Sequence, residues 1–166
     1  MPIIALYVKA ELENVASFRP PEGHLWCLDI QNSSGGELRE KVMLDPDEQL
    51  ELKGSKGHAN LVIKEGSREH SMSVVEVKGL VKALTPDDEW VPIVAFECRG
   101  IEPIAWHPTD GYEVVSAGGK VFDDVDLSED PTMWADYCDQ LGQPVQISNL
   151  QWRFDLLKGA KAIGKG

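Results

Sequence analysis

The 166-residue sequence predicts an all-β fold, mainly antiparallel and sandwich- or barrel-like, built of two similar pseudo-symmetric halves. Short apolar or alternating segments recur about every ten residues, and Gly-, Pro-, Asn- and Ser-rich turns separate them. Two of these segments also resemble each other, which favours a duplicated half. One short helix is expected near 131–141, where Ser128 or Asp130 would provide the cap.

The two similar segments begin near Ile3 and Trp90. At an offset of 89 positions the matched pairs are Ile4 with Ile93, Tyr7 with Phe96, Leu12 with Ile101, Glu13 with Glu102, and Val15 with Ile104. A fixed offset is typical of a repeat, although two unrelated strands can also look alike. We therefore predict an N-terminal β half at 1–84, a C-terminal β half at 85–158 that opens with a linker at 85–89, and a flexible tail at 159–166.

Individual strands follow from the pattern of apolar residues and breakers. In the first half they are predicted at 3–12, 25–30, 37–44, 49–53, 59–64 and 70–78. Pro20 and Pro21 exclude a helix from the first connection, and the polar stretch 31–36 predicts a hairpin turn. In the second half the predicted strands are 90–99, 111–117, 120–127 and 145–157.

The chain is acidic, with a net charge of −12. This charge argues against binding nucleic acid or an anionic membrane surface, since both need a basic face. The acid is concentrated in the second half, where segment 110–139 carries nine carboxylates and only one basic residue, Lys120. That segment is either a solvated face that keeps the protein soluble or a docking surface for a basic protein partner.

Three widely spaced cysteines, Cys27, Cys98 and Cys138, form no disulfide framework. The apolar run from Ile3 to Val8 is too short for a signal sequence, and no stretch approaches the length of a transmembrane helix. We therefore expect a monomeric protein in the cytoplasm.

Two stretches resemble ligand-binding loops but fail the pattern. Gly118-Gly119-Lys120 lacks the first Gly and the final Ser or Thr of a phosphate-binding loop, because valines stand in both places. Asp124–Ser128 begins like a calcium loop, but Glu129 and Ala135 replace the required Gly and Glu. The first stretch predicts a hairpin turn, and neither predicts a ligand site.

Histidines and cysteines give no complete set of metal ligands. His24 and Cys27 are close in sequence, but one pair completes no site, and Cys27 lies in an apolar strand. A buried structural role is favoured for Cys27 and for Cys98. His107 and Asp110 could line a pocket, but a residue that follows a strand more often lies in a surface turn.

Several longer stretches resemble a known family. They are Ile4–Asn14, the Gly54-Ser-Lys-Gly57 turn, Arg68-Glu-His-Ser71, Phe96-Glu-Cys-Arg-Gly-Ile-Glu-Pro103, and Phe122-x-Asp-x-x-Leu127 with Trp134-x-Asp-Tyr137. Their order and spacing are similar to the eukaryotic CXXC-motif zinc-binding protein family, formerly a domain of unknown function. The likeness covers residues 3–157, nearly the whole chain.

The resemblance implies an antiparallel β protein of two similar halves, with one zinc held by two Cys-x-x-Cys turns in the first half. Here the four ligand positions are occupied by Asn32, Gly35, Ile63 and Gly66. These residues supply no soft ligand, whereas a structural zinc site needs four. We therefore expect a divergent member that lacks both motifs and binds no metal or other cofactor.

The leading functional hypothesis is a non-enzymatic, soluble protein that has lost its zinc site and acts through protein–protein interaction. The family likeness implies no established catalytic activity. One alternative keeps metal handling through substitute ligands such as His24, Cys27 or His70. Another is a hydrolase or transferase that uses the acidic second half, which would need a deep cleft with a buried carboxylate or histidine.

Overall fold

The computed structural model describes residues 2–53, 57–129, 132–158 and 162–163, and this part of the chain contains strands and no helix. The strands are β1 (Ile3–Glu13), β2 (Val15–Arg19), β3 (Trp26–Asn32), β4 (Leu38–Leu44), β5 (Leu50–Glu51), β6 (His58–Ala59), β7 (Leu61–Glu65), β8 (Arg68–Val77), β9 (Val91–Arg99), β10 (Ile101–Trp106), β11 (Tyr112–Ser116), β12 (Val121–Val125), β13 (Trp134–Cys138), β14 (Gln143–Leu156) and β15 (Ala162–Ile163). The all-β prediction is confirmed. No helix among the described residues has the length and apolar character needed to span a membrane.

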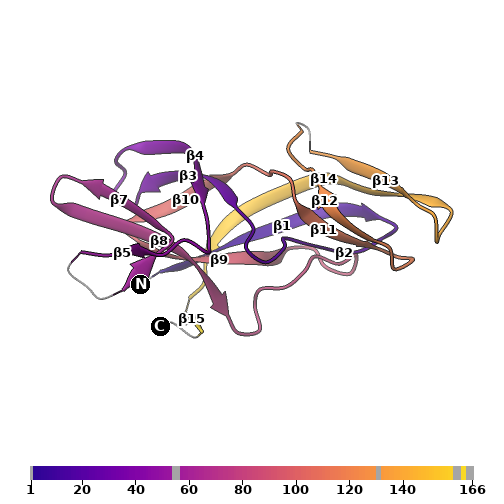
Figure 1. Ribbon diagram of the computed structural model, residues 1–166, viewed down its shortest axis with the longest axis horizontal. Coiled ribbons are helices and arrows are strands. Elements are labelled where there is room, and N and C mark those ends of the chain that lie inside the picture. Colours follow the sequence, from indigo (N-terminus) through magenta and orange to yellow (C-terminus); the bar gives the residue numbers. More distant parts are fainter. Residues whose placement is uncertain (1, 54–56, 130–131, 159–161, 164–166) are drawn as a thin grey trace.

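A long antiparallel sheet runs through the centre of the molecule (Figure 1). Its strand order is β13-β14-β1-β9-β8-β15, and β7 pairs with β8 beside this path. Strands β1 and β9 lie side by side, with Leu6 opposite Val94, and consecutive apolar residues of both strands are buried. Because β1 and β9 are central, each half of the chain contributes one strand to the middle of the molecule.

Two smaller sheets, β10-β3-β4 and β12-β11-β2, lie toward opposite ends of the molecule (Figure 1). The chain enters each through a single residue with positive φ, Asn14 (φ 57°) between β1 and β2 and Gly100 (φ 76°) between β9 and β10. Strand β2 then pairs with β11, and β10 pairs with β3. Each half therefore gives a strand to a hairpin of the other half.

The equivalent turns also test the sequence offset. An offset of 89 positions would place Asn14 against Pro103, whereas the structure makes Gly100 the equivalent of Asn14. The residue matches proposed at that offset therefore do not hold at the turn. The two sequence segments were aligned out of register. Apolar residues that repeat every two positions fit several alignments equally well, so they do not fix one.

Aromatic side chains fill the space where the sheets meet. Trp26 of β3 packs edge-on against Phe96 of β9, with ring centroids 6.1 Å apart. Its ring is tilted against that of Trp106 of β10, with centroids 6.3 Å apart. Phe18 of β2 packs against Tyr112 of β11 at 5.4 Å. All five rings are buried, so the core joins strands from both halves.

The helix expected near 131–141 is wrong. Residues Trp134–Cys138 form β13, in which Trp134 lies opposite Ile147 of β14 and packs on Phe122, with ring centroids 5.2 Å apart. Cross-strand pairing outweighs the local helix signal here. Ser128 bonds to Asp126 rather than capping a helix, and Asp130 and Pro131 lie outside the described residues.

Two other predicted segments fall partly outside the described residues. In the turn Gly54-Ser-Lys-Gly57 only Gly57 is described. Of the tail 159–166, which we expected to be flexible, only Ala162–Ile163 are described, and they form β15 on Val77 and Glu76 of β8.

Candidate functional site

The four positions at which the family resemblance implies zinc ligands lie in two neighbouring hairpins. Asn32 ends β3 and Gly35 lies in the turn to β4, while Ile63 lies in β7 and Gly66 in the turn to β8. Gly35 and Gly66 have φ of 86° and 61°, and no atom lies within 4 Å of where their Cβ would be. Glycine suits both turns because it adopts positive φ without strain.

Asn32 connects these two turns. Its Oδ1 accepts hydrogen bonds from Ser34 N (2.9 Å) and Ser34 Oγ (2.6 Å), which closes its own turn. Its Nδ2 donates to Glu65 Oε2 in the other hairpin (3.1 Å) and lies 3.4 Å from Nε2 of His70. One side-chain amide thus links residues that lie 33 and 38 positions away in sequence. We call Asn32, Glu65 and His70 the interturn cluster.

His70 is held in place from several sides. Its side chain is almost fully buried on β8, directly opposite Ile63 of β7, and its Nε2 lies 3.7 Å from Glu65 Oε2. The imidazole also packs against the backbone of Gly100, where a Cβ would clash with Nδ1. The carbonyl of Gly100 in turn accepts a hydrogen bond from Ser33 N (2.9 Å). The interturn cluster therefore also touches the β9–β10 turn.

These residues do not fit a structural zinc site. Such a site needs four thiolate or imidazole ligands in tetrahedral geometry, whereas the interturn cluster offers one imidazole, one carboxylate and a neutral amide. Ile63 is part of the hydrophobic core, and the two glycines have no side chain to offer. Among the described residues, no group of three or more His, Cys, Asp or Glu side chains is placed to hold a metal ion.

The three proposed substitute ligands lie in different surroundings. His24 is buried between the rings of Trp26 and Tyr112, at centroid distances of 4.7 and 4.5 Å. Burial lowers the pKa of His24 to about 4, against the opposing effect of the Asp110 carboxylate. Cys27 is buried in β3, and burial together with the Asp29 carboxylate raises the pKa of its thiol. His70, by contrast, contacts the two turns.

His107 and Asp110 do not form a shared pocket wall. His107 Nε2 lies 2.7 Å from Oδ1 of Asp29 in β3, and its backbone N–H donates to the carbonyl of Cys27 (2.9 Å). Burial alone would raise the pKa of Asp29, but hydrogen bonds from Lys41 N and from His107 lower it. The pair ties the end of β10 to β3, which is a structural role.

The acidic segment 110–139 has a solvated face. Of its described carboxylates, only Glu113 is partly buried, and it pairs with Arg19 of β2 at 2.8 Å. Asp126 accepts two hydrogen bonds from Ser128, and these lower the pKa of Asp126. Asp130 lies outside the described residues. Exposed carboxylates of this kind are suited to long-range attraction of a cation rather than to acid–base chemistry.

Comparison with known proteins identifies the family. The family model described as "CXXC motif containing zinc binding protein, eukaryotic" matches residues 5–155. The chain belongs to this family. Among its curated relatives, the CXXC motif containing zinc binding protein of Mus musculus is 34% identical over 158 residues, covering 91% of this chain and 96% of its own length. A UPF0587 protein of Caenorhabditis elegans is 30% identical over 169 residues, covering 97% and 99%.

Two solved structures share the fold. A hypothetical protein from Plasmodium falciparum superposes with a TM-score of 0.85 at 31% identity, covering 93% of this chain and all of that one. The crystal structure of C1orf123 gives a TM-score of 0.82, also at 31% identity, and covers 93% of this chain and 99% of its own. The overall fold of this chain is therefore shared with both solved structures.

The sequence pattern gave no indication that Glu65 and Gly100 lie beside the four predicted positions. The role of Glu65 is evident only in the structure, where the β7–β8 hairpin places its carboxylate beside the Asn32 amide. Its signal in the sequence is weak, because a single Glu in a polar turn is usually solvated. His70 was considered only as a metal ligand, whereas the structure places it beside an amide and a carboxylate.

Proposed function

We propose that this chain is a non-enzymatic, protein-binding member of the CXXC zinc-binding family, in which the interturn cluster joins the two turns in place of zinc. The observation that carries this proposal is the Asn32 amide, which bonds within its own turn and to Glu65 of the other. Zinc in the family would connect these same two turns through its four ligands.

The interturn cluster stabilises the fold less than a zinc site would, so other contacts must supply the remaining stability. A thiolate zinc site can contribute on the order of 10 kcal/mol to folding, whereas one hydrogen bond to a charged group contributes about 1.5–3 kcal/mol. Ile63 supplies part of the difference, because burying an aliphatic side chain stabilises a fold by about 1.5–3 kcal/mol. The close packing of His70 on Gly100 adds contacts that a metal site would not need.

Protein binding in the cytoplasm is supported by the surface and by the cysteines. Large apolar side chains stand exposed on several strands, among them Met43 (50%) and Leu156 (52%), and the acidic face offers a complementary surface to a basic partner. The three cysteines are all free and buried, which suits a reducing compartment.

Metal analysis tests the proposal directly. The purified protein should contain no stoichiometric zinc, and a chelator should leave its melting temperature unchanged. One zinc per chain, or a melting temperature lowered by several degrees with chelator, would overturn the proposal, because either result requires a working metal site.

A gain-of-function variant provides the matched control. Restoring all four ligands in Asn32→Cys/Gly35→Cys/Ile63→Cys/Gly66→Cys should give a chain that binds one zinc and is stabilised by it. The two-cysteine variant Asn32→Cys/Gly35→Cys should not bind zinc stoichiometrically. Failure of the four-cysteine chain to bind zinc would show that the two turns no longer sit as a zinc site requires.

A further inference from the structure

Part of the β14 edge lacks a partner strand. Strand β1 pairs with β14 up to Leu156, whereas β13 covers the opposite edge only from Gln143 to Ile147. A bulge around Asn149, which has φ of 52°, separates the covered part from the rest. Beyond this bulge, no strand of the described chain pairs with the outer edge of β14.

The alternation of hydrogen bonds between β1 and β14 identifies the residues whose backbone groups face the outer edge of β14. Leu157 N donates to Ile3 O (2.8 Å), so that pair is a hydrogen-bonded one. In an antiparallel ladder, hydrogen-bonded and non-bonded pairs alternate. The intervening register, with Leu156 opposite Ile4, Phe154 opposite Leu6 and Trp152 opposite Val8, therefore turns the N–H and C=O groups of these three β14 residues away from β1.

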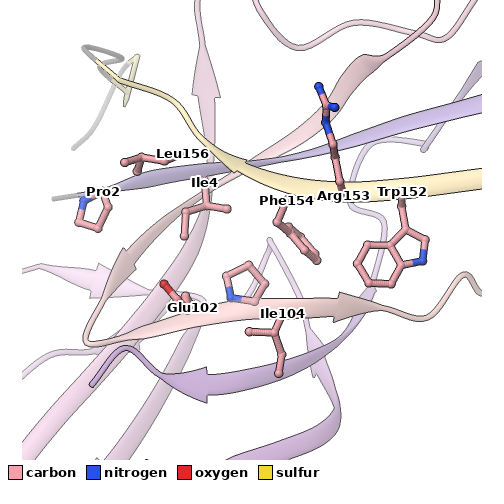
Figure 2. A pocket seen from close by; sticks show the side chains of 9 residues that line it. Pro2, Ile4, Glu102, Ile104, Trp152, Arg153, Phe154 and Leu156 are labelled. Carbon is pink, nitrogen blue, oxygen red and sulfur yellow. The ribbon is translucent and has the colours of Figure 1, made fainter. Parts of the chain in front are cut away.

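The same three residues border an apolar groove between β14 and β10 (Figure 2). The groove has a volume of about 600 Å³ and is lined on the β10 side by Pro103 and Ile104. Figure 2 shows Trp152 and Phe154 pointing from β14 toward β10. Leu156 is 52% exposed, Ile104 38% and Trp152 37%. An edge that is both unpaired and apolar is a surface prepared for another strand.

The opposite face of the same strand carries one positive and one negative charge. Arg153 points away from the groove (Figure 2), and its guanidinium stacks on Trp90, with its centre 4.6 Å from the ring centroid. Its Nε donates to Oδ2 of Asp155 at 2.8 Å, and both side chains are about half exposed. The two charges lie on either side of Phe154 in sequence.

We propose that the exposed edge of β14 pairs antiparallel with β14 of a second copy of this chain, with Phe154 on the two-fold axis. In this register Trp152 lies opposite Leu156 of the second copy, and both residues present free backbone groups. Arg153 lies opposite Asp155 of the second copy, and Asp155 opposite its Arg153. The segment 152–156 is thus its own complement in both backbone bonding and charge.

Other registers satisfy fewer of these conditions. Centring the axis on Arg153 would place the Arg153 side chains of the two copies opposite each other, which sets like charges together. Centring it on Trp152 would place Arg153 opposite Gln151 and run the ladder across the bulge at Asn149. The register centred on Phe154 also leaves β13 of each copy beyond the end of the shared ladder.

The dimer would form whether or not the chain binds zinc, and it differs from the monomer expected from the sequence. The net charge of −12 on each copy opposes association, so the dimer is weak and reversible and forms as concentration rises. In the dimer, side chains from both copies cover the apolar groove that each copy alone leaves open to solvent.

Charge reversal tests the register, with sedimentation equilibrium from low micromolar to near-millimolar protein as the readout. The wild-type mass should rise from 18.4 kDa toward twice that value. Arg153→Asp and Asp155→Arg each place like charges opposite each other and should weaken dimerisation at least tenfold, and the double exchange Arg153→Asp/Asp155→Arg should restore it. A wild type that stays monomeric throughout, or an exchange variant no better than the single variants, would overturn the proposal.

Cross-linking gives a second test that does not depend on charge. Because Phe154 lies on the axis, Phe154→Cys chains should oxidise to a disulfide-linked dimer, since paired residues bring Cα atoms about 5.5 Å apart. Trp152→Cys alone and Leu156→Cys alone should not cross-link, whereas a mixture of the two should. Cross-linking of either single variant at the rate of Phe154→Cys would show a different register and overturn the proposal. The native cysteines are buried and provide the unreactive background.

Discussion

Gly100 packs so closely against His70 that no Cβ fits between its backbone and Nδ1 of the imidazole. The relationship joins the β9–β10 turn to the interturn cluster, and it depends on a glycine for two reasons. The residue has φ of 76°, which favours glycine. The His70 imidazole also occupies the space that a Cβ of residue 100 would fill.

Gly100→Ala should therefore be costly to stability. Backbone strain at positive φ contributes about 1 kcal/mol, and the clash with a buried ring adds roughly 1–3 kcal/mol. The matched control is Gly111→Ala, because Gly111 has a similar φ of 83° but no atom within 4 Å of its Cβ position. Urea denaturation should show the Gly100 variant to be the less stable of the two. Equal losses would mean that the contact with His70 contributes nothing.

The bond between Asn32 and Glu65 should be measurable as a coupling energy. Asn32→Ala leaves the carboxylate without its amide donor and should lower the free energy of unfolding by about 1–2 kcal/mol. In a double-mutant cycle with Glu65→Ala, the coupling should be about 0.5–1.5 kcal/mol. Additive losses within error would show that the two turns are joined by other contacts.

Folding stability should depend on His24 in mildly acidic solution. Its pKa is about 4 in the folded chain against 6.5 in the unfolded one, so the unfolded state binds more protons between these values. Stability should therefore fall as the pH drops from 6.5 to 4, by roughly 3 kcal/mol in full, and should show no His24 contribution above that window. His24→Phe keeps the ring packing but cannot be protonated, so its stability should vary less across this range in urea titrations. A variant with the wild-type slope would assign the pH dependence to other groups.

Binding of a basic partner to segment 110–139 should depend strongly on salt. Exposed charges are screened over ~8–10 Å at physiological ionic strength, so the association rate with an oligolysine probe should fall steeply as salt rises. Asp123→Asn/Asp124→Asn/Asp136→Asn neutralises exposed carboxylates and should flatten this dependence. The control variant Glu40→Gln/Glu48→Gln/Glu51→Gln, in the first half, should change the salt dependence of the association rate less. An association rate that ignores salt would exclude the segment as the attracting surface.

The strands were predictable wherever local pattern decides structure. Apolar or alternating runs bounded by turn residues predicted strands where β1, β9, β11 and β14 lie. The segment at Trp134 was misread, because its helical appearance is local, whereas its partner Ile147 is visible only in the folded sheet. The exchange of β2 and β10 between the halves was also beyond prediction, since pairing between distant strands leaves no mark in either one.

The contacts among the candidate site residues were not predictable from the sequence. Family likeness singled out Asn32, Gly35, Ile63 and Gly66 as the expected ligand positions, and these residues lie in two adjacent hairpins. It could not show that the Asn32 amide reaches Glu65, because that bond depends on how the hairpins approach each other. Polar turn residues look alike in sequence whether they face solvent or one another.

The central place of β1 has a consequence for the order of events during synthesis. Strand β1 ends at Glu13, whereas its two neighbours, β9 and β14, begin only at Val91 and Gln143. At about 5–20 residues per second, β1 stays without β14 for roughly ten seconds or more, with its apolar side chains exposed. Strand β1 can therefore pair on both sides only after most of the described strands have been made.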